Sequence, residues 1–518
     1  MQKRGIMLET QVIVVGAGPV GLMLAGELRL GGVDVVVLER LSAPTGESRA
    51  SQLNARTMEI FDQRGLLERL GETQRESMGH FGGLSFDVTG VPSAYPGFWK
   101  IPQFRTEAML QAWAGELGAD IRRGHELRSV HVTDDWVEAD VEHLGGSLRL
   151  RAPYVVGCDG EHSTVRQVAG FDFPGTDVTR ELLRADVVGI DVPNRRFQRH
   201  DRGLVIAAKR GGDVTRIMLH EFGQSARRRT HAPAFEEVVT GWHRITGEDI
   251  SGGTPIWVDA FGDASRHASA YRKGRVLLAG DAAHLQMPIG GQALNLGLHE
   301  AANLGWKLAA QVQGWAPADL LDSYHAERHP VGARTLTTVQ AQALLLLGGP
   351  EVEPLRASLA ELLELDDVRT HLAAMASGLD VRYGAGPGDH PWLGARMPHC
   401  DLVTAAGPSS STALLRSARG VLLDFSTDRA LHAERSATAA AWENRVHLAT
   451  VRSRPGGIPP EINALLVRPD GHIAWVDDGA REVRTALSRW FGSPAPGRSL
   501  VAEDIITAAN SPRHSLGR

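Results

Sequence analysis

The sequence near the N-terminus follows the order strand, glycine-rich turn, helix that a dinucleotide-binding unit requires. Val12 to Val15 form an apolar run, and Gly16-Ala17-Gly18-Pro19-Val20-Gly21 leads from it into a helix-patterned stretch. Gly16 permits the tight turn, Gly18 lets the backbone approach a pyrophosphate, and Gly21 allows close packing of helix on strand. The sequence therefore predicts that phosphates lie at the N-terminus of this helix.

A second strand and an acidic residue complete this unit. Gly31-Gly32 ends the helix, residues 33–38 predict a strand, and Glu39 falls at its end. A carboxylate at that position accepts hydrogen bonds from ribose hydroxyls and disfavours a 2′-phosphate. The site is therefore expected to prefer FAD or NAD to NADP.

Two further segments place glycine-rich turns after strands. Residues 154–156 predict a strand followed by Gly157-Cys158-Asp159-Gly160, and residues 275–279 predict a buried strand that ends at Gly280-Asp281. Asp159 can meet a ribityl chain or pyrophosphate waters, and Asp281 can hold the ribityl chain. Both carboxylates thus point to a flavin rather than to a generic nucleotide.

The third segment continues into a loop of small residues before another helix. Residues 288–291 form the loop, and the helix is expected from about Gln292 onward. The amides of Gly290 and Gly291, together with the helix dipole, face whatever anion lies against them. Reduced flavin carries negative charge near its pyrimidine edge, so this arrangement favours flavin reduction.

Length and composition limit the function classes. The chain has 518 residues, which predicts three structural units, and a formal net charge of −6 without basic runs, so nucleic acid is not an expected partner. Only Cys158 and Cys400 are present, which excludes a disulfide scaffold and a cysteine-rich metal site. No signal peptide and no apolar stretch of roughly 20 residues occur, so we expect a soluble cytoplasmic protein without a membrane or metal partner.

The predicted fold is α/β with three domains. Residues 1–79, 101–172 and 276–396 form a discontinuous Rossmann-like FAD-binding domain with a helical extension, and residues 80–100 and 173–275 form an inserted β-rich substrate domain. In residues 397–518, the order of strands and helices suits a thioredoxin-like C-terminal domain. That domain lacks Cys-x-x-Cys, so its expected role is packing or contact within a homodimer.

The three segments, taken in order, resemble the signatures of single-component flavin-dependent aromatic hydroxylases of the para-hydroxybenzoate hydroxylase class. Within that class the chain is most similar to polyketide hydroxylases of the angucycline type. The likeness extends over nearly the whole chain, including GHFGGL at residues 79–84 and RRGHE at residues 122–126.

The resemblance implies an FAD monooxygenase that uses NADPH or NADH and O2. Oxygen would react with reduced flavin to give a C4a-hydroperoxide, which hydroxylates a polycyclic aromatic polyketide of the angucycline or tetracycline kind in antibiotic biosynthesis. The implied catalytic positions are Arg49, beside the moving flavin, and Pro288, Gly290 and Gly291. The implied cofactor-binding residues are Gly16, Gly18, Pro19, Gly21, Glu39, Arg40, Arg49, Gln103, Asp159, Asp281, Pro288, Gly291, Gln292, Ala293, Leu294 and Asn295.

The chain departs from the family pattern at two positions. Ala293 stands where relatives usually have glycine, which would cost about 1 kcal/mol if that backbone needed a positive φ and would otherwise narrow the pocket. Glu300 replaces a more usual aspartate. These changes leave the oxygenation outcome open between hydroxylation and rearrangement.

Substrate residues follow less directly from the sequence. A flat aromatic cavity is expected to include Phe81, Trp99, Met218, His220 and Met287, with His80 as a further candidate. For His284 a structural role is expected, because a polyketide naphthol can supply phenolate character itself.

Alternative functions also fit these motifs. A Baeyer–Villiger or oxidative-rearrangement flavoenzyme on a similar polyketide shares the same peroxide intermediate. A non-catalytic flavin-binding scaffold is the alternative from a different class. A flavin halogenase is disfavoured because the Trp-x-Trp-x-Ile-Pro segment is absent.

Overall fold

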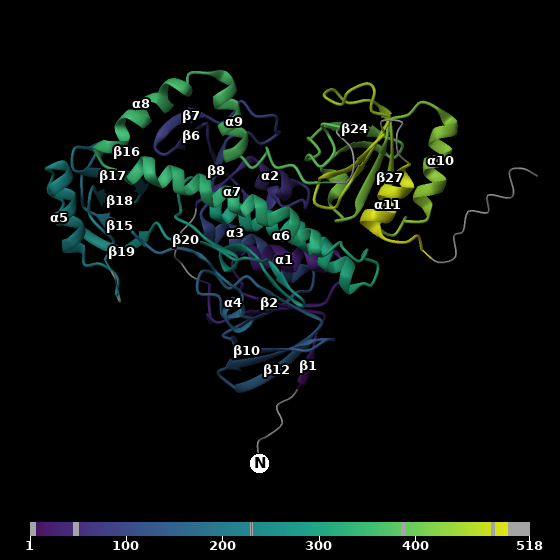
Figure 1. Ribbon diagram of the computed structural model, residues 1–518, viewed down its shortest axis with the longest axis horizontal. Coiled ribbons are helices and arrows are strands. Elements are labelled where there is room, and N and C mark those ends of the chain that lie inside the picture. The colour runs from purple at the N-terminus through teal and green to yellow at the C-terminus, as the bar shows by residue number, and fades with distance from the viewer. Residues whose placement is uncertain are drawn as a thin grey trace, which may run out of the picture. The chain divides into compact units, whose positions relative to one another are not determined.

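Figure 1 shows a computed structural model of the chain, which describes residues 7–44, 51–227, 229, 231–384, 390–477 and 482–495. The chain divides into two compact units. The first comprises residues 1–313 with 319–382, and the second comprises residues 314–318 with 383–518. The described parts of all three glycine-rich segments belong to the first unit.

A six-stranded sheet forms the centre of the first unit, and only its β21–β22 edge pair is antiparallel. All four residues of β2 are buried, as expected for a parallel strand covered on both faces. Helix α1 (Pro19–Leu30) packs against α3 (Gln103–Glu116) and α6 (Gln292–Val312). The strand order is β21 (Arg272–Lys273), β22 (Val276–Leu278), β13 (Tyr154–Gly157), β2 (Val12–Val15), β3 (Val35–Glu39) and β9 (Asp120–Arg123).

The register of this sheet brings the glycine-rich turns together. Val15 pairs with Leu38 on one side and with Gly157 on the other, and Gly157 pairs with Leu278. Because these strands are parallel, the turns that follow them emerge at one edge of the sheet. Segments more than 100 residues apart in the chain therefore meet there, as the sequence predicts.

A β-rich part of the first unit contains a five-stranded antiparallel sheet. Its order is β16 (Arg195–His200), β17 (Gly203–Gly211), β18 (Val214–Glu221), β15 (Glu181–Val188) and β19 (Thr254–Gly262). Arg210-Gly211-Gly212-Asp213 between two short apolar runs predicts a hairpin turn, and the β17–β18 connection confirms it. The prediction of a mostly β segment missed α5 (Phe235–Thr246), although its buried Val238, Val239, Trp242 and Ile245 have helical spacing.

Smaller sheets and short helices complete the β-containing part of this unit. A four-stranded sheet has the order β1 (Met7–Glu9), β12 (Gly146–Ala152), β11 (Val137–His143) and β10 (Glu126–Val132). The remaining short elements are β4 (Gln52–Leu53), β5 (Gln74–Glu76), β6 (Met78–Phe81), β7 (Leu84–Asp87), β8 (Phe98–Lys100), β14 (Gly175–Thr176), β20 (Ser265–His267), β23 (His284–Leu285), α4 (Thr164–Val168) and the 3-10 turn η2 (Gly280–Ala282).

The spacing of Leu53, Met58, Phe61 and Leu66 predicts a helix over residues 53–70, but the observed helix is shorter. It is α2 (Ala55–Asp62), which is capped by the Asn54 side chain and followed by the 3-10 turn η1 (Leu67–Leu70). Gly65 has a φ of 67°, which a continuous right-handed helix does not accommodate. The chain therefore breaks between the two elements.

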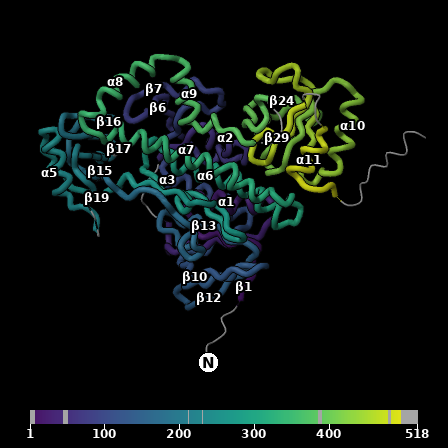
Figure 2. The backbone as a smooth tube through the Cα atoms, viewed as in Figure 1, coloured from purple at the N-terminus to yellow at the C-terminus, as the bar shows by residue number. Residues whose placement is uncertain are grey.

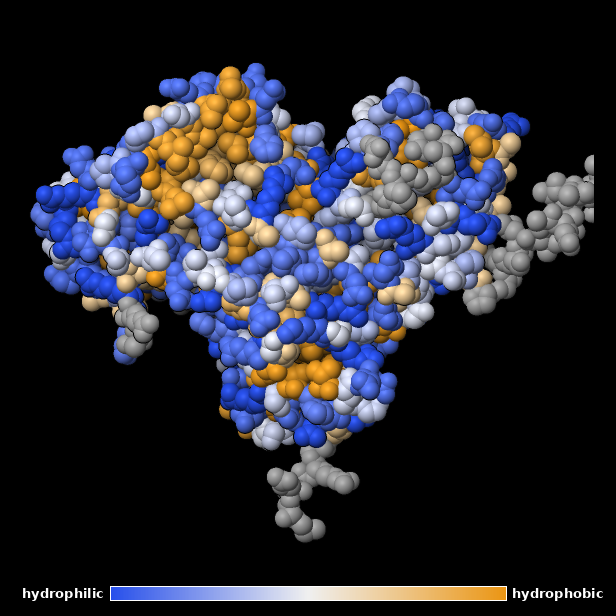
Figure 3. All heavy atoms as spheres, viewed as in Figure 1, coloured by the Kyte–Doolittle hydropathy of each residue, from blue (hydrophilic) through white to orange (hydrophobic). Residues whose placement is uncertain are grey.

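Long helices lie beside the parallel sheet. Helix α7 (Asp322–Leu347), which contains Pro330, runs beside α6, as Figure 2 shows. Helices α8 (Glu353–Leu362) and α9 (Asp366–Ala376) follow it and were not predicted. An apolar surface area lies over α8 in Figure 3, and Leu355, Leu362 and Leu365 are exposed there.

The second unit is a six-stranded mixed sheet with two helices. Its order is β25 (Gly407–Ser410), β24 (Asp401–Thr404), β27 (Val446–Ser453), β26 (Gly420–Asp424), β28 (Ala464–Val467) and β29 (Ile473–Val476). Strands β26 and β27 are parallel, and β28 is antiparallel to β26. The predicted helices correspond to α10 (Arg429–Ala440) and α11 (Val483–Phe491), whereas β27 was not predicted.

Candidate functional site

A cavity of about 410 Å³ lies at the edge of the central sheet where the glycine-rich turns meet. Its walls come from the ends of β2, β3 and β13 and from the start of α3. Six of the predicted cofactor-binding residues line this cavity, namely Gly16, Gly18, Glu39, Arg40, Gln103 and Asp159. Pro19, Gly21, Asp281 and the loop at residues 288–295 lie outside this lining set.

The three glycines of the first turn have different surroundings. A Cβ on Gly16 would lie 2.3 Å from the Cys158 carbonyl oxygen, and a Cβ on Gly21 would lie 2.0 Å from the Gly16 carbonyl oxygen. At Gly18 a Cβ would meet no atom within 4 Å. Gly18 is also the N-cap of α1 and has no side-chain capping bond, with Pro19 following it. The turn is thus tightly packed on the protein side and open on the cavity side, which fits a pyrophosphate at the helix N-terminus.

Glu39 holds the backbone of the first turn. Its two carboxylate oxygens accept hydrogen bonds from the backbone N–H groups of Ala17 and Leu41, each at 2.9 Å. Nearby, Gln103 donates to Glu107 at 2.8 Å, and burial raises the pKa of the Glu107 carboxyl. Glu39 therefore lines the cavity from a position fixed by two amides.

Asp159 accepts a hydrogen bond from the first turn of α4, whose N-cap is Ser163. Its carboxylate accepts hydrogen bonds from the Ser163 hydroxyl at 2.5 Å and from the backbone N–H of Val165 at 3.1 Å. Burial raises the pKa of Asp159 even though these hydrogen bonds favour the charged form. The sequence predicts that Arg166 supplies positive charge at this turn. In the structure its side chain donates to the carbonyls of Ala282 and Glu161 at 3.0 and 2.7 Å.

The loop before α6 adopts the conformation that glycine allows. Gly290 and Gly291 both have a φ of 67°, and Gly291 is the N-cap of α6. Ala293 lies in the first turn of α6 and does not have a positive φ, so its Cβ causes no backbone strain. For Ala293, the sequence left two possibilities open, namely strain at a left-handed backbone position or a narrower pocket. The first of these is wrong.

Asn295 connects this helix to α2 and β4. Its amide group donates to the carbonyls of Gln52 and Gly291 at 3.0 and 2.7 Å. Its side-chain oxygen accepts from the backbone N–H of Asn54 at 2.9 Å and from the Thr57 hydroxyl at 2.6 Å. Sequence reasoning proposed only a cofactor contact for Asn295, because its partners lie about 240 residues earlier in the chain.

His284 and Glu300 form a fully buried pair behind the third turn. The His284 Nε2 atom lies 3.0 Å from the carboxylate of Glu300, which also accepts from the backbone N–H of Gly280 at 2.8 Å. Burial opposes both charges, but the attraction between them raises the pKa of His284 and lowers the pKa of Glu300. The neighbouring Asp281 is exposed.

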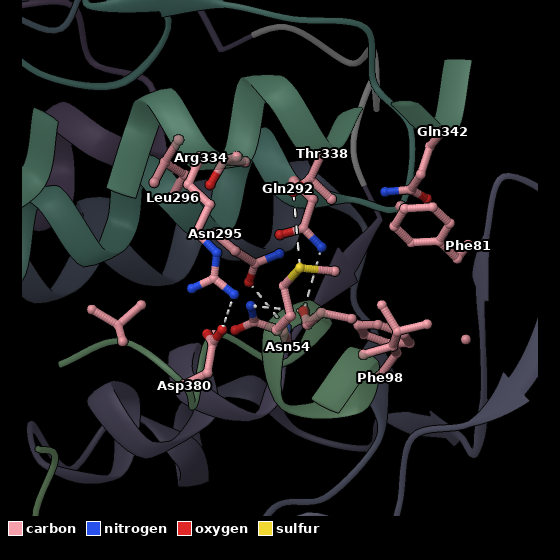
Figure 4. Close-up of a pocket in the computed structure, with 18 of the residues that line it drawn as sticks. Asn54, Phe81, Phe98, Gln292, Asn295, Leu296, Arg334, Thr338, Gln342 and Asp380 are labelled. Atoms are coloured by element: carbon pink, nitrogen blue, oxygen red, sulfur yellow. Dashed lines mark hydrogen bonds and ion pairs between the residues drawn. The ribbon is translucent and has the colours of Figure 1, made fainter. Parts of the chain in front are cut away.

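A second cavity, of about 280 Å³, lies between the start of α6, helices α7 and α9, and the strands β6 to β8 (Figure 4). Gly290, Gln292 and Asn295 of the third segment line it, and so does the predicted substrate residue Phe81. Other side chains in its wall are Gln52, Asn54, His80, Phe86, Phe98, Arg196, His299, Arg334, Thr335, Thr338, Gln342, Leu372, Met375, Asp380 and Arg382.

The other predicted substrate residues are not among those that line this cavity. Trp99 packs against the main core and donates its Nε1–H to the Tyr95 carbonyl at 3.2 Å. Met218 and Met287 belong to a separate apolar cluster. His220 is buried, with its ring nitrogens 2.8 and 3.1 Å from the carbonyl oxygens of Glu181 and Leu347.

The electrostatics of the second cavity are set by arginines. Burial, together with the positive charges of Arg196 and Lys100, lowers the pKa of His80 to about 4. His80 is therefore neutral near pH 7 and accepts from the backbone N–H of Gly83 at 3.3 Å through Nδ1. Arg334 forms an ion pair with Asp380, drawn as a dashed line in Figure 4.

The implied catalytic residue Arg49 lies outside the described residues. Within the ranges that the structure describes, no group of three or more His, Cys, Asp or Glu side chains is arranged to hold a metal ion. Within those same ranges, no helix is both long and apolar enough to cross a bilayer.

The mixed α/β fold and the glycine turn at the start of α1 define a dinucleotide-binding class, and comparison with known proteins identifies the family. Residues 9–339 match the family described as FAD binding domain, and residues 390–494 match the family described as aromatic-ring hydroxylase, C-terminal. The chain therefore belongs to the family of FAD-dependent aromatic-ring monooxygenases and is an oxidoreductase. FAD is its cofactor, and NAD(P)H is the reductant typical of the family.

Related proteins match almost the whole chain. A 12-dehydrotetracycline 5-monooxygenase/anhydrotetracycline 6-monooxygenase of Streptomyces rimosus is 40% identical over 506 residues, covering 93% of this chain and 99% of the relative. The crystal structure of CabE, an aromatic hydroxylase from angucycline biosynthesis, has 51% identity and a TM-score of 0.89 over 94% of this chain and 99% of that chain. A dialkyldecalin synthase of Streptomyces rugosporus is 39% identical over 493 residues, covering 93% of this chain and 99% of the relative.

Proposed function

We propose that the protein hydroxylates a polycyclic aromatic polyketide, of the angucycline or tetracycline kind, in an antibiotic pathway. The observation that carries this proposal is the lining of the second cavity. Gly290, Gln292 and Asn295 of the third segment form part of its wall, and aromatic side chains, including Phe81, form another part. The relatives named for tetracycline and angucycline chemistry support the same substrate class.

The first cavity provides the groups that suit the adenosine and diphosphate parts of FAD. Gly16 and Gly18 line it at the N-terminus of α1, which Pro19 begins and where Gly21 lets the turn pack closely, while Glu39 and Arg40 lie where a ribose would be held. Gln103, Asp159 and Asp281 supply further polar contacts in the same proposal.

The loop before α6 is proposed to face the flavin ring. Pro288, Gly290 and Gly291 shape it, and residues 292–295 begin the helix whose dipole favours negative charge at its N-terminus. Bound flavin supplies the activation of dioxygen, and the protein orients the aromatic ring and keeps water away from it. Arg49 is proposed to border the ring.

Further parts of the proposal concern architecture and assembly. We infer a Rossmann-like FAD domain over residues 1–79, 101–172 and 276–396, an inserted β-rich substrate domain over residues 80–100 and 173–275, and a thioredoxin-like domain over residues 397–518. The observed sheet orders support these assignments. A cytoplasmic homodimer completes the proposal.

Mass spectrometry of turnover with labelled dioxygen tests the function. The purified yellow protein is given NADPH or NADH and either anhydrotetracycline or an angucyclinone, and products are collected under ¹⁸O2. One labelled oxygen on a ring carbon is expected for hydroxylation. A labelled lactone would instead support Baeyer–Villiger insertion, and absence of any aromatic-dependent NAD(P)H consumption would support a flavin-binding scaffold without oxygenase activity.

A further inference from the structure

The second cavity is elongated along α7. Its wall on that helix runs from Pro330 to Gln342, with Arg334 and Thr338 between them. At a rise of 1.5 Å per residue, this wall is roughly 18 Å long. The cavity is thus a slot whose length suits several fused rings lying parallel to the helix axis.

The two ends of the slot differ in chemistry. Phe81 and Phe98 lie near Gln342 at one end in Figure 4, where His80 is neutral. Arg334 and Asp380 lie at the opposite end, and Arg382 is also part of the cavity wall. Among the described residues that line the cavity, Arg196 acts on His80 beside Phe81, whereas Arg334 pairs with Asp380 at the other end.

The geometry of the Arg334–Asp380 pair leaves the guanidinium available to a ligand. The Asp380 side chain is 17% exposed, whereas the Arg334 side chain is 48% exposed. One Nη2–H of Arg334 is donated to Asp380, and a guanidinium has five N–H donors in a planar fork. The pair therefore fixes the direction of Arg334 and leaves donors for an anionic oxygen.

We propose that Arg334 determines substrate specificity by binding an anionic oxygen, such as an ionised enol, phenol or carboxylate, at the end of the slot opposite Phe81. Asp380 is the positioning residue for Arg334. This inference rests on the proposed function, because it takes the slot as the substrate site. It adds that the substrate is an acid and that its ionised group points away from the aromatic end.

A matched pair of probes tests this proposal by binding alone. Anthracene-2-carboxylate and anthracene-2-carboxamide share ring system and shape but differ in charge, and their dissociation constants are measured with the FAD-loaded protein by fluorescence. The wild type is expected to bind the carboxylate about tenfold more tightly, since hydrogen bonds between charged groups are roughly twice as strong as neutral ones. This preference should fall with added salt.

Variants assign the preference to Arg334. Arg334→Gln should abolish the preference for the carboxylate probe, and Arg334→Lys should retain part of it. Asp380→Asn removes the negative charge but keeps an acceptor oxygen, so it should increase the preference. Arg128→Gln is the matched control, because Arg128 is likewise half-exposed and paired with Glu126 and Glu142, on the separate β10–β12 sheet. It should leave the preference unchanged.

Two outcomes would overturn the proposal. The first is an Arg334→Gln protein with an unchanged carboxylate preference. The second is a wild-type protein that binds the carboxylate and the carboxamide equally well. If NADP⁺ binding weakens in Arg334→Gln while the anthracene preference persists, the first outcome would in addition assign Arg334 to phosphates of the reductant. The binding experiment measures no turnover. Its result is therefore independent of whether the labelled-dioxygen experiment detects hydroxylation.

Discussion

The side-chain oxygen of Asn295 accepts a hydrogen bond of 2.6 Å from the Thr57 hydroxyl, and so ties the first turn of α6 to the first turn of α2. The same side chain bonds Gln52, Asn54 and Gly291. One buried amide thus fixes the loop that faces the proposed flavin ring to β4 and α2.

Replacing Asn295 by alanine should loosen this junction. The buried Asn54 N–H would lose its partner, at a cost of about 1–3 kcal/mol. We expect a lower melting temperature and reduced FAD content after purification, measured by thermal unfolding and by the absorbance ratio of flavin to protein. Thr337→Ala, at an exposed position on α7, is the control. Unchanged stability and flavin content would contradict the role of Asn295.

Gly21 and Gly18 should respond differently to alanine. Gly21→Ala places a Cβ 2.0 Å from the Gly16 carbonyl oxygen, so the turn must shift and the protein should lose both stability and FAD. Gly18→Ala meets no protein atom within 4 Å, so the protein without FAD should unfold at the wild-type temperature. Any loss of FAD affinity in Gly18→Ala then reports on the space that the ligand needs. A destabilised Gly18→Ala protein would argue against an open turn.

Asp281→Ala is expected to weaken FAD binding without unfolding the protein. Asp281 is exposed and directly follows Gly280, which packs against Val20 of α1. The proposed ribityl contact would be lost. Flavin content and the dissociation constant for FAD, obtained by titrating the apoprotein, are the measurements. Wild-type flavin occupancy would refute the assignment of Asp281.

The buried His284–Glu300 pair should make stability depend on pH. The raised pKa of His284 gives stabilisation that is complete below its unfolded pKa of about 6.5 and is lost as pH rises through the folded value. The lowered pKa of Glu300 gives stabilisation that is lost only when pH falls through its folded value. Glu300→Gln should therefore cost about 3 kcal/mol near pH 6 and less near pH 9.

Urea unfolding of the wild type and Glu300→Gln across that range checks the sign. The difference in unfolding free energy between the two proteins should narrow as pH rises. A difference that widened with pH would mean that His284 is not charged in the folded state.

His80 should destabilise the fold as pH falls. Its folded pKa of about 4 lies below the unfolded value of about 6.5, so the unfolded state binds more protons between these values. Between about pH 7 and about pH 5, this effect removes about 2 kcal/mol of stability. His80→Asn should lose less stability over that interval, as measured by urea unfolding. Equal losses in both proteins would contradict a neutral His80.

The elements that place the flavin site could be predicted because their signals are local. Strands β2, β13 and β22 are short apolar runs with a glycine at the strand end or within two residues after it, and that pattern requires no knowledge of distant residues. Helices α8 and α9 were missed, and so was α5 despite its helical spacing. The break at Gly65 was missed because the apolar spacing around it is helical and does not reveal the positive φ of this residue.

The second cavity could be predicted only in part. Phe81 was named from the sequence as a possible lining residue of a flat aromatic cavity, but Arg334 and Asp380 look like solvated charges until α7 and the segment after α9 are brought together. The family and its cofactor are established by the comparisons. The individual roles of the site residues stay predictions, including those of Trp99, Met218, His220 and Met287.

The assembly of one sheet edge from β2, β13 and β22 has a consequence for biosynthesis. While the ribosome is still translating the residues before Val276, the nascent chain has the first two glycine turns but lacks the strand that delivers the third. On the proposal that the third turn contacts FAD, vectorial synthesis makes capture of the prosthetic group a late event. A polypeptide terminated before Val276 is then expected to be released without FAD, even though it contains the glycine turn at Gly16.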